Sequence, residues 1–155
     1  MLDLGTSFLA SVSRDPKALA LVDGELRLTY EQWYETISAV VAGLDRLGLK
    51  AGDHLVTVLQ NRAEAATVHW ACQFAGIIIT PINWRSKDDE IDFAVENSGA
   101  KGIVYEEVSA EAVAASTACR SITRIAVGEG RDGDVSYAEI ASGKAPPAQP
   151  RVGAE

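Results

Sequence analysis

The stretch HLVTVLQNRAEAATVHWACQFAGIIIT, residues 54–80, decides the fold class. Its first six residues form a short, largely apolar run that predicts a strand. Asn61 and Glu64 then form a helix-capping pattern, and the helix that they open is expected to run to Gly76. A strand followed at once by a helix is the first half of a βαβ unit, from which parallel sheets are built.

Ile77-Ile78-Ile79-Thr80 completes this unit. The run is β-branched throughout and almost fully apolar, which is typical of a parallel strand covered on both faces. Pro81 is expected to end it. Strand, helix and strand in this order predict a right-handed crossover within a mostly parallel sheet.

Toward the amino terminus, the clearest element is a helix that begins with the capping box Thr29-x-x-Gln32 and ends near Gly48, a residue suited to a left-handed helix end. Apolar residues follow the capping box at helical spacing: Trp33, Ile37, Val40, Val41, Leu44 and Leu47. This stripe predicts the face of the helix that packs into the core.

Two shorter features precede that helix. Residues 18–22 and 26–28 are apolar runs, and Asp23-Gly24 between them predicts a type I′ hairpin. Before the hairpin, a first helix capped by Thr6 or Ser7 is expected to stop near Asp15-Pro16.

Toward the carboxyl terminus, helices and strands keep alternating. Ser86 is expected to cap a helix that Gly99 closes, and the acids of its first turn suit its positive end. Further elements are expected as a strand at 103–105, a helix at 110–119, a strand at 122–127 and a last short helix capped by Ser136-x-x-Glu139. We therefore predict an α/β fold with a mostly parallel sheet flanked by helices, a domain over residues 1–143 and a linker-like tail over residues 144–155.

Composition excludes several classes of function. The 155 residues carry a formal net charge of −8, and such an acidic surface is a poor partner for nucleic acid or anionic lipid. The longest apolar run is far shorter than the roughly 20 residues of a membrane-spanning helix, so no membrane span is expected. Two cysteines without CxxC spacing and a first segment without a basic signal region favour a cytoplasmic protein.

Three patterns suggest chemistry, and each has a simpler interpretation. Gly128-x-Gly130-x-x-Gly133 follows a strand, but Glu129, Asp132 and Asp134 surround it with negative charge, so it is expected to be a surface loop and not a dinucleotide site. His69 and Cys72 share a helix face but lack the further ligands that a zinc site needs. Asp88, Asp89, Glu90 and Asp92 are explained by the dipole of the helix that they open. We expect no catalytic residue and no metal ligand in this chain.

Several short segments follow one another in a fixed order along the chain: Ala18–Gly24, Leu28-Thr29-Tyr30, Gly43-Leu44, Leu47-Gly48-Leu49, Gly52-Asp53, Leu59-Gln60-Asn61, Ala75-Gly76, Thr80-Pro81-Ile82-Asn83 and Asn97-Ser98-Gly99-Ala100-Lys101. Taken in series, they resemble the opening of the adenylate-forming superfamily, which includes acyl-CoA synthetases, aryl-CoA ligases and luciferases. The resemblance runs from about residue 6 to residue 106.

The resemblance implies that the chain forms part of the large N-terminal domain of an ATP-dependent, AMP-forming carboxylate–CoA ligase. The complete enzyme would use ATP, Mg²⁺ and CoA with a carboxylic acid, and the remainder of the chain would be the partner of this segment. The family's catalytic signatures, a phosphate loop ending in Pro-Lys-Gly among them, are not in the sequence. The fragment alone is therefore expected to be inactive and to bind no cofactor tightly, and its tail resembles the linker that leads to the phosphate loop.

One site residue is carried over from the family. Asn83-Trp84-Arg85 resembles a segment in which an arginine of some ligases approaches the phosphates of CoA, and a guanidinium can bind phosphate through two N–H groups. The alternative is an exposed arginine that pairs with Asp88 or Asp89. Two other classes of function stay open at this point, a non-catalytic α/β scaffold and a nucleotide-binding module.

Overall fold

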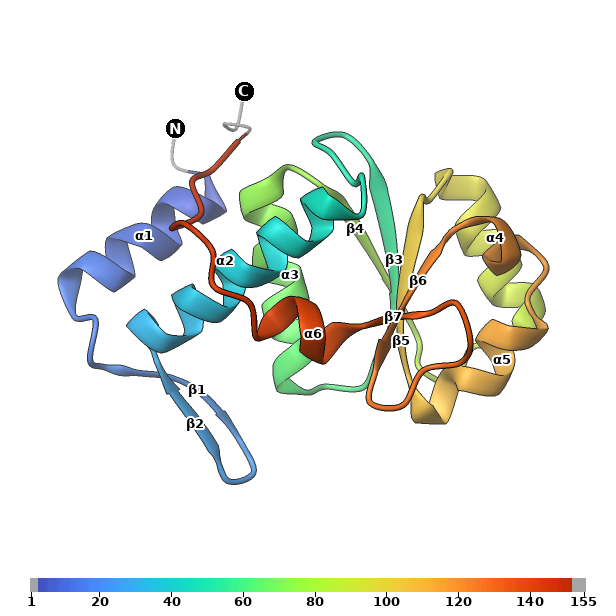
Figure 1. Ribbon diagram of the computed structural model, residues 1–155, viewed down its shortest axis with the longest axis horizontal. Coiled ribbons are helices and arrows are strands. Elements are labelled where there is room, and N and C mark those ends of the chain that lie inside the picture. Colours follow the sequence, from blue (N-terminus) through green and yellow to red (C-terminus); the bar gives the residue numbers. More distant parts are fainter. Residues whose placement is uncertain (1–2, 152–155) are drawn as a thin grey trace.

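A computed structural model describes residues 3–151 and shows a five-stranded parallel sheet between two layers of helices (Figure 1). In chain order the elements are α1 (Leu4–Arg14), β1 (Leu19–Asp23), β2 (Leu26–Thr29), α2 (Tyr30–Arg46), β3 (His54–Val58), α3 (Ala63–Ala75), β4 (Ile78–Ile82), α4 (Asp88–Ser98), β5 (Gly102–Glu106), η1 (Glu107–Ser109), α5 (Ala110–Ala115), η2 (Ala118–Ser121), β6 (Thr123–Val127), β7 (Val135–Ser136) and α6 (Tyr137–Ala141). The predicted α/β class is confirmed.

The sheet has the strand order β4-β3-β5-β6-β7, and every neighbouring pair is parallel. From β3 the chain crosses to β4 on one side, and from β4 it crosses back to β5 on the other side of β3. The strand order therefore changes direction between β3 and β5. In open α/β sheets, ligands bind outside the carboxyl ends of the strands at such a switch point.

Side chains that alternate along the central strands pack into two separate hydrophobic cores, one on each face of the sheet. On one face, Leu55, Val104 and Ile125 pack with α2, α3 and α6, and α1 joins this layer through Phe8. On the other face, the second set of strand residues packs with α4, α5 and η2: Val56, Val58, Ile103, Tyr105 and Ala126. Burial on both faces explains why the strands read as nearly continuous apolar runs.

Helix α2 matches its prediction most closely. Thr29 and Gln32 form the expected capping box, in which each side chain accepts from the backbone N–H of the other residue. The predicted stripe is buried from Trp33 to Leu44, and Leu47 packs against the same core from a partly exposed position. The indole N–H of Trp33 donates to the Thr67 hydroxyl at 3.0 Å, which satisfies the one polar atom of this buried ring.

Other caps differ from the prediction. Helix α1 is capped by Asp3, whose carboxylate accepts from the Thr6 N–H, and not by Thr6 or Ser7. Helix α4 begins after Lys87, not Ser86, and the Glu90 carboxylate accepts from the Lys87 N–H at 2.9 Å. These shifts of one to four residues arise because several polar residues compete for the first turn.

Helix α3 shows a larger departure. The expected capping pattern of Asn61 and Glu64 does not form, and α3 begins after Arg62, which makes no cap with its side chain. The oxygen that caps α3 instead belongs to the hairpin: the Asp23 carboxylate accepts from the Ala63 N–H at 2.8 Å. A residue 40 positions away in the sequence supplies this cap, so a local pattern could not reveal it.

The hairpin of β1 and β2 projects from the body of the molecule (Figure 1). It is not of type I′, because that turn needs positive φ at both central residues and only Gly24 has it, with φ of 56°.

Strand β4 also differs from its prediction: it continues through Pro81 to Ile82, and Ile78 is 48% exposed. Both differences in β4 follow from its place at the edge of the sheet. The backbone N–H groups on the open side of an edge strand need no partner strand, so a proline is tolerated there, and no strand covers that side.

The remaining differences lie late in the chain. The helix expected at 110–119 stops at Ala115 and is followed by the short helix η2, and the two-residue strand β7 has no counterpart in the prediction. Residues 144–151 form no helix or strand, but Ala148 is buried against α2. Residues 152–155 of the predicted tail lie outside the described residues. Between residues 3 and 151, no helix is long and apolar enough to cross a membrane.

Candidate functional site at the carboxyl edge of the sheet

Four segments meet at the carboxyl edge of the parallel sheet. They follow β3, β4, β5 and β6, whose ends align because Val58 pairs with both Ile82 and Tyr105 in register. We call this edge, made of residues 59–62, 83–86, 106–109 and 128–134, the carboxyl edge. In open parallel sheets this is the edge at which ligands bind.

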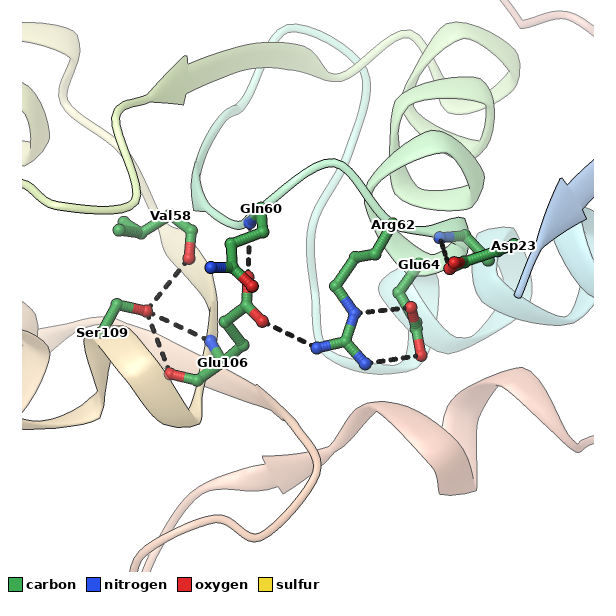
Figure 2. A network of polar contacts seen from close by, with 8 residues as sticks. Asp23, Val58, Gln60, Arg62, Glu64, Glu106 and Ser109 are labelled. Atoms are coloured by element: carbon green, nitrogen blue, oxygen red, sulfur yellow. Dashed lines mark hydrogen bonds and ion pairs between the residues drawn. The ribbon is translucent and has the colours of Figure 1, made fainter. Parts of the chain in front are cut away.

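A polar network occupies the switch point between β3 and β5 (Figure 2). Its centre is Glu106 at the end of β5, which is 4% exposed. One carboxylate oxygen accepts from the Gln60 N–H, and the other accepts from Arg62 Nη1 at 2.7 Å. The same guanidinium donates through Nε and Nη2 to Glu64, at 2.7 and 3.1 Å. A single arginine thus bridges two carboxylates from separate segments.

Ser109 closes the network from the opposite side (Figure 2). Its buried hydroxyl lies 3.0 Å from the carbonyl oxygens of Val58 and Glu106 and can donate to one of them at a time. It also accepts from the Glu106 N–H at 3.3 Å. Because buried polar groups are costly without partners, these contacts hold the ends of β3 and β5 together.

The network is suited to closing the switch point, and it is poorly suited to holding phosphate. It joins one guanidinium to two carboxylates, so an anion would meet an excess of negative groups. The Gln60 N–H, which a phosphate would need as a donor, is already bound to Glu106. The hydrogen bond with Glu64 raises the pKa of Arg62, with a further contribution from Glu106, so the guanidinium stays charged.

The predicted site residue Arg85 lies on the same edge, in the turn that follows β4. The turn is closed by a hydrogen bond from the Ser86 N–H to the Asn83 carbonyl at 2.9 Å. The Arg85 N–H donates to the Asn83 side chain, also at 2.9 Å. Arg85 is exposed, and its guanidinium carbon lies 4.0 Å from the centroid of the Trp84 ring.

The alternative partners expected for Arg85 are not used. Within residues 3–151, no carboxylate lies within 4.0 Å of its guanidinium, so the ion pair with Asp88 or Asp89 does not form. Asp89 instead accepts from the Glu90 N–H at 3.0 Å, at the start of its own helix. The structure therefore brings Arg85 together with Trp84 and Asn83, and within residues 3–151 its guanidinium forms no hydrogen bond or ion pair.

The other patterns have structural explanations. Residues 128–133 form an exposed loop, as expected, and Asp134 anchors it by accepting from the Tyr105 hydroxyl and from Arg124. Asp92 accepts from Ser116 and from the Ala118 N–H, so it organises the chain ahead of η2.

The two possible metal ligands on α3, His69 and Cys72, lie in different environments. His69 is exposed, whereas Cys72 is fully buried, and burial raises the pKa of its thiol to about 12. Among the described residues, no group of three or more histidine, cysteine, aspartate or glutamate side chains is placed to hold a metal ion.

The sequence reasoning missed Glu106 and Arg62, and it considered Asp134 only as part of the negative charge around the glycine loop and not as its anchor. A usable signal was present, because Glu106 and Arg62 both follow apolar strands closely, where parallel strands gather polar side chains. The pairing itself joins residues 44 positions apart and could not be read from spacing.

Comparisons with known proteins place this geometry in context. A family model described as "AMP-binding enzyme" matches residues 8–153. A feruloyl-CoA synthase from Amycolatopsis sp is 30% identical over 126 residues, which are 81% of this chain and 26% of that protein. A benzoate CoA ligase from Burkholderia xenovorans LB400 has a TM-score of 0.87 at 13% identity, over 99% of this chain and 31% of its own. The N-terminal domain of FACL13 from Mycobacterium tuberculosis has a TM-score of 0.81 at 25% identity, over 98% of this chain and 38% of its own.

Proposed function

This chain belongs to the family of AMP-binding enzymes, and from that premise we propose that it forms the amino-terminal part of an ATP-dependent, AMP-forming carboxylate–CoA ligase. The observation that carries the proposal is the continuous family match from residue 8 to residue 153. The chain spans about a quarter of the length of the feruloyl-CoA synthase that it matches, so the activity is proposed for a longer protein.

In that protein, a carboxylate would attack ATP to form an acyl-adenylate and pyrophosphate, and the CoA thiol would then displace AMP to give the thioester. Mg²⁺ would neutralise phosphate charge during the first step. Among the described residues, the switch point at which an open α/β sheet would bind a nucleotide is filled by the ion pair of Glu106 and Arg62. We therefore assign adenylation to segments outside these residues.

Within this division of labour, residues 1–143 would form part of the N-terminal domain and residues 144–155 would lead toward the phosphate loop. The remainder of the protein would be the main partner of this segment. Arg85 is the one residue that we assign to a substrate, as a contact for the phosphates of CoA. Its exposure and its lack of a carboxylate partner among the described residues support this role.

The activity is tested with the full-length product of the gene that encodes this chain. Incubation with ATP, Mg²⁺, CoA and a panel of aromatic and aliphatic acids should give AMP, pyrophosphate and a thioester with at least one acid. Formation of ADP and phosphate instead, or no acid-dependent nucleotide consumption with any acid, would contradict the proposal.

The role of Arg85 is tested in the same protein by the Arg85→Ala substitution. CoA enters only in the second step, so a phosphate contact cannot assist attack on ATP. A charge-assisted contact contributes about 1.5–3 kcal/mol, so the KM for CoA should rise on the order of tenfold to a hundredfold. Exchange of labelled pyrophosphate into ATP, which reports the first step, serves as the internal reference.

Arg120→Ala, at another exposed arginine, is the matched control and should leave the KM for CoA unchanged. Equal losses in both steps for Arg85→Ala would indicate a folding defect. No loss in either step would make Arg85 an ordinary surface residue.

A further inference from the structure

We propose that Trp84 is a positioning residue that holds the Arg85 guanidinium ready to bind a phosphate of CoA. This inference rests on the proposed function and adds a second residue to its CoA contact. The observation behind it is the stacking of the Arg85 guanidinium on the Trp84 ring, with 4.0 Å between Cζ and the ring centroid. At this distance the guanidinium lies over the face of the ring, within the range of a cation–π contact.

Hydrogen bonds within the turn fix the backbone of Trp84 and Arg85. Asn83 accepts from the Arg85 N–H and the Ser86 N–H donates to the Asn83 carbonyl, so the backbone of the turn is held by two hydrogen bonds of 2.9 Å. Trp84 is partly buried. The hydrogen bonds fix the backbone from which both side chains start, and the contact with the indole sets the direction of the guanidinium.

Whether the Arg85 guanidinium contacts an indole or a carboxylate decides whether its N–H groups can bind phosphate. A carboxylate at this position would neutralise the guanidinium and occupy the N–H groups that bind phosphate in pairs. The indole does neither, because it contacts the face of the guanidinium and leaves the N–H groups at its rim free. The nearby acids do not compete: Glu90 accepts from the Lys87 N–H and Asp89 accepts from the Glu90 N–H.

The expected effect is pre-organisation. An arginine side chain loses rotamer freedom when it binds, and a ring that already restricts it removes part of this cost. An exposed cation–π contact supplies about 0.5–1 kcal/mol, which corresponds to a factor of about two to five in affinity. Trp84→Ala should therefore raise the KM for CoA about two- to fivefold, less than Arg85→Ala.

The experiment is a double-mutant cycle in the full-length protein. Wild type, Trp84→Ala, Trp84→Phe, Arg85→Ala and the double variant Trp84→Ala/Arg85→Ala are compared for the KM for CoA and for pyrophosphate exchange, and the Kd of CoA is measured by calorimetry. Trp84→Phe retains an aromatic face and should stay close to wild type. Phe93→Ala, which removes another exposed aromatic ring from the neighbouring helix, should leave the KM for CoA unchanged.

The inference predicts that Trp84→Ala weakens CoA binding when Arg85 is present and adds nothing when Arg85 is already alanine. An equal loss in both backgrounds would mean that Trp84 contacts CoA directly, and no loss in either would mean that the stacking has no role; both results overturn the inference. If the wild type forms acyl-adenylate and thioester but Trp84→Ala behaves like wild type, only this inference fails. If the wild type neither binds CoA nor forms thioester, the proposed function fails as well.

Discussion

Asp134 shows how a single buried carboxylate anchors a loop of the carboxyl edge. Its side chain is 2% exposed and accepts from the Tyr105 hydroxyl, the Arg124 guanidinium and the Arg131 N–H. Burial by itself raises the pKa of this carboxyl, but the hydrogen bonds from Tyr105 and Arg124 outweigh burial and hold the pKa below its ordinary value. The charged form is therefore the one that stabilises the fold.

This pKa shift predicts a pH-dependent contribution to stability. A carboxyl whose pKa is lower in the folded state stabilises fully above its unfolded pKa, about 3.9, and the contribution is lost as the pH falls through the folded pKa. Asp134→Asn should lower the free energy of unfolding by about 1–3 kcal/mol at pH 7. The difference from wild type should be constant above about pH 5 and should shrink below about pH 4.

Urea unfolding of both proteins between pH 2.5 and pH 7 measures this difference. Asp132→Asn, at an exposed position of the same loop, is the matched control and should change stability by less than about 0.5 kcal/mol. A difference for Asp134→Asn that stayed constant down to pH 2.5 would show that the carboxylate charge does not stabilise the loop.

For the helices and strands, the sequence correctly predicted those features that depend on interactions within a single element. The capping box and apolar stripe of α2 lie within one helix, and both were read from the sequence. The cap of α3 was not, because Asp23 reaches it from the hairpin, and the continuation of β4 through Pro81 was not, because only the strand order reveals an edge.

The candidate site followed the same division. Arg85 was carried over from the family resemblance as a contact for CoA, with an ion pair to Asp88 or Asp89 as the alternative. Among the described residues that ion pair does not form, and the contact of Arg85 with the Trp84 ring was not predicted. The network of Glu106 and Arg62 was missed because it forms between two strands that become neighbours only in the folded sheet.

The contact between α2 and α6 depends on Gly43, in the last turn of α2. A Cβ atom at Gly43 would lie 2.6 Å from the Cβ of Ile140, closer than side chains pack, so α6 would have to move. Alanine in a helix is favoured over glycine by about 1 kcal/mol, but overpacking typically costs about 1–3 kcal/mol. Gly43→Ala should therefore lower stability, and the cost should fall mainly on the docking of α6.

Thermal and urea unfolding test this prediction, with hydrogen exchange of the α6 amides as a local measure. Gly143→Ala is the control, because a Cβ there meets its nearest atom, the Ile140 carbonyl oxygen, at 3.9 Å. If Gly43→Ala were as stable as wild type or more stable, the close contact between α2 and α6 would not exist in solution.

At the scale of the whole molecule, the last described residues are part of the packed structure. The Tyr34 hydroxyl donates to the Ala148 carbonyl, and the Ala148 N–H donates to the Ser38 hydroxyl at 3.0 Å. Arg151 pairs with Asp45 at the end of α2, and its N–H donates to the Phe74 carbonyl at 3.0 Å. Over its described residues, the segment that we propose leads toward the phosphate loop is thus held against α2 and α3.

The same view explains why we place no catalysis in this chain. The switch point of the sheet is closed by Glu106, Arg62 and Ser109, and the glycine loop after β6 is anchored by a carboxylate. The described residues build a layered scaffold whose carboxyl edge carries two exposed arginines, Arg85 and Arg131, and Arg85 is the one that contacts an indole ring. We therefore propose that this segment supports adenylation carried out by other parts of a ligase.

This proposal is tested by acid-dependent pyrophosphate release from ATP and Mg²⁺, followed side by side for the 155-residue chain and for the full-length gene product with the same panel of acids. We expect release by the full-length protein with at least one acid and none above background by the 155-residue chain. Acid-dependent release by the 155-residue chain alone would contradict it, because the described residues would then have to contain an adenylation site.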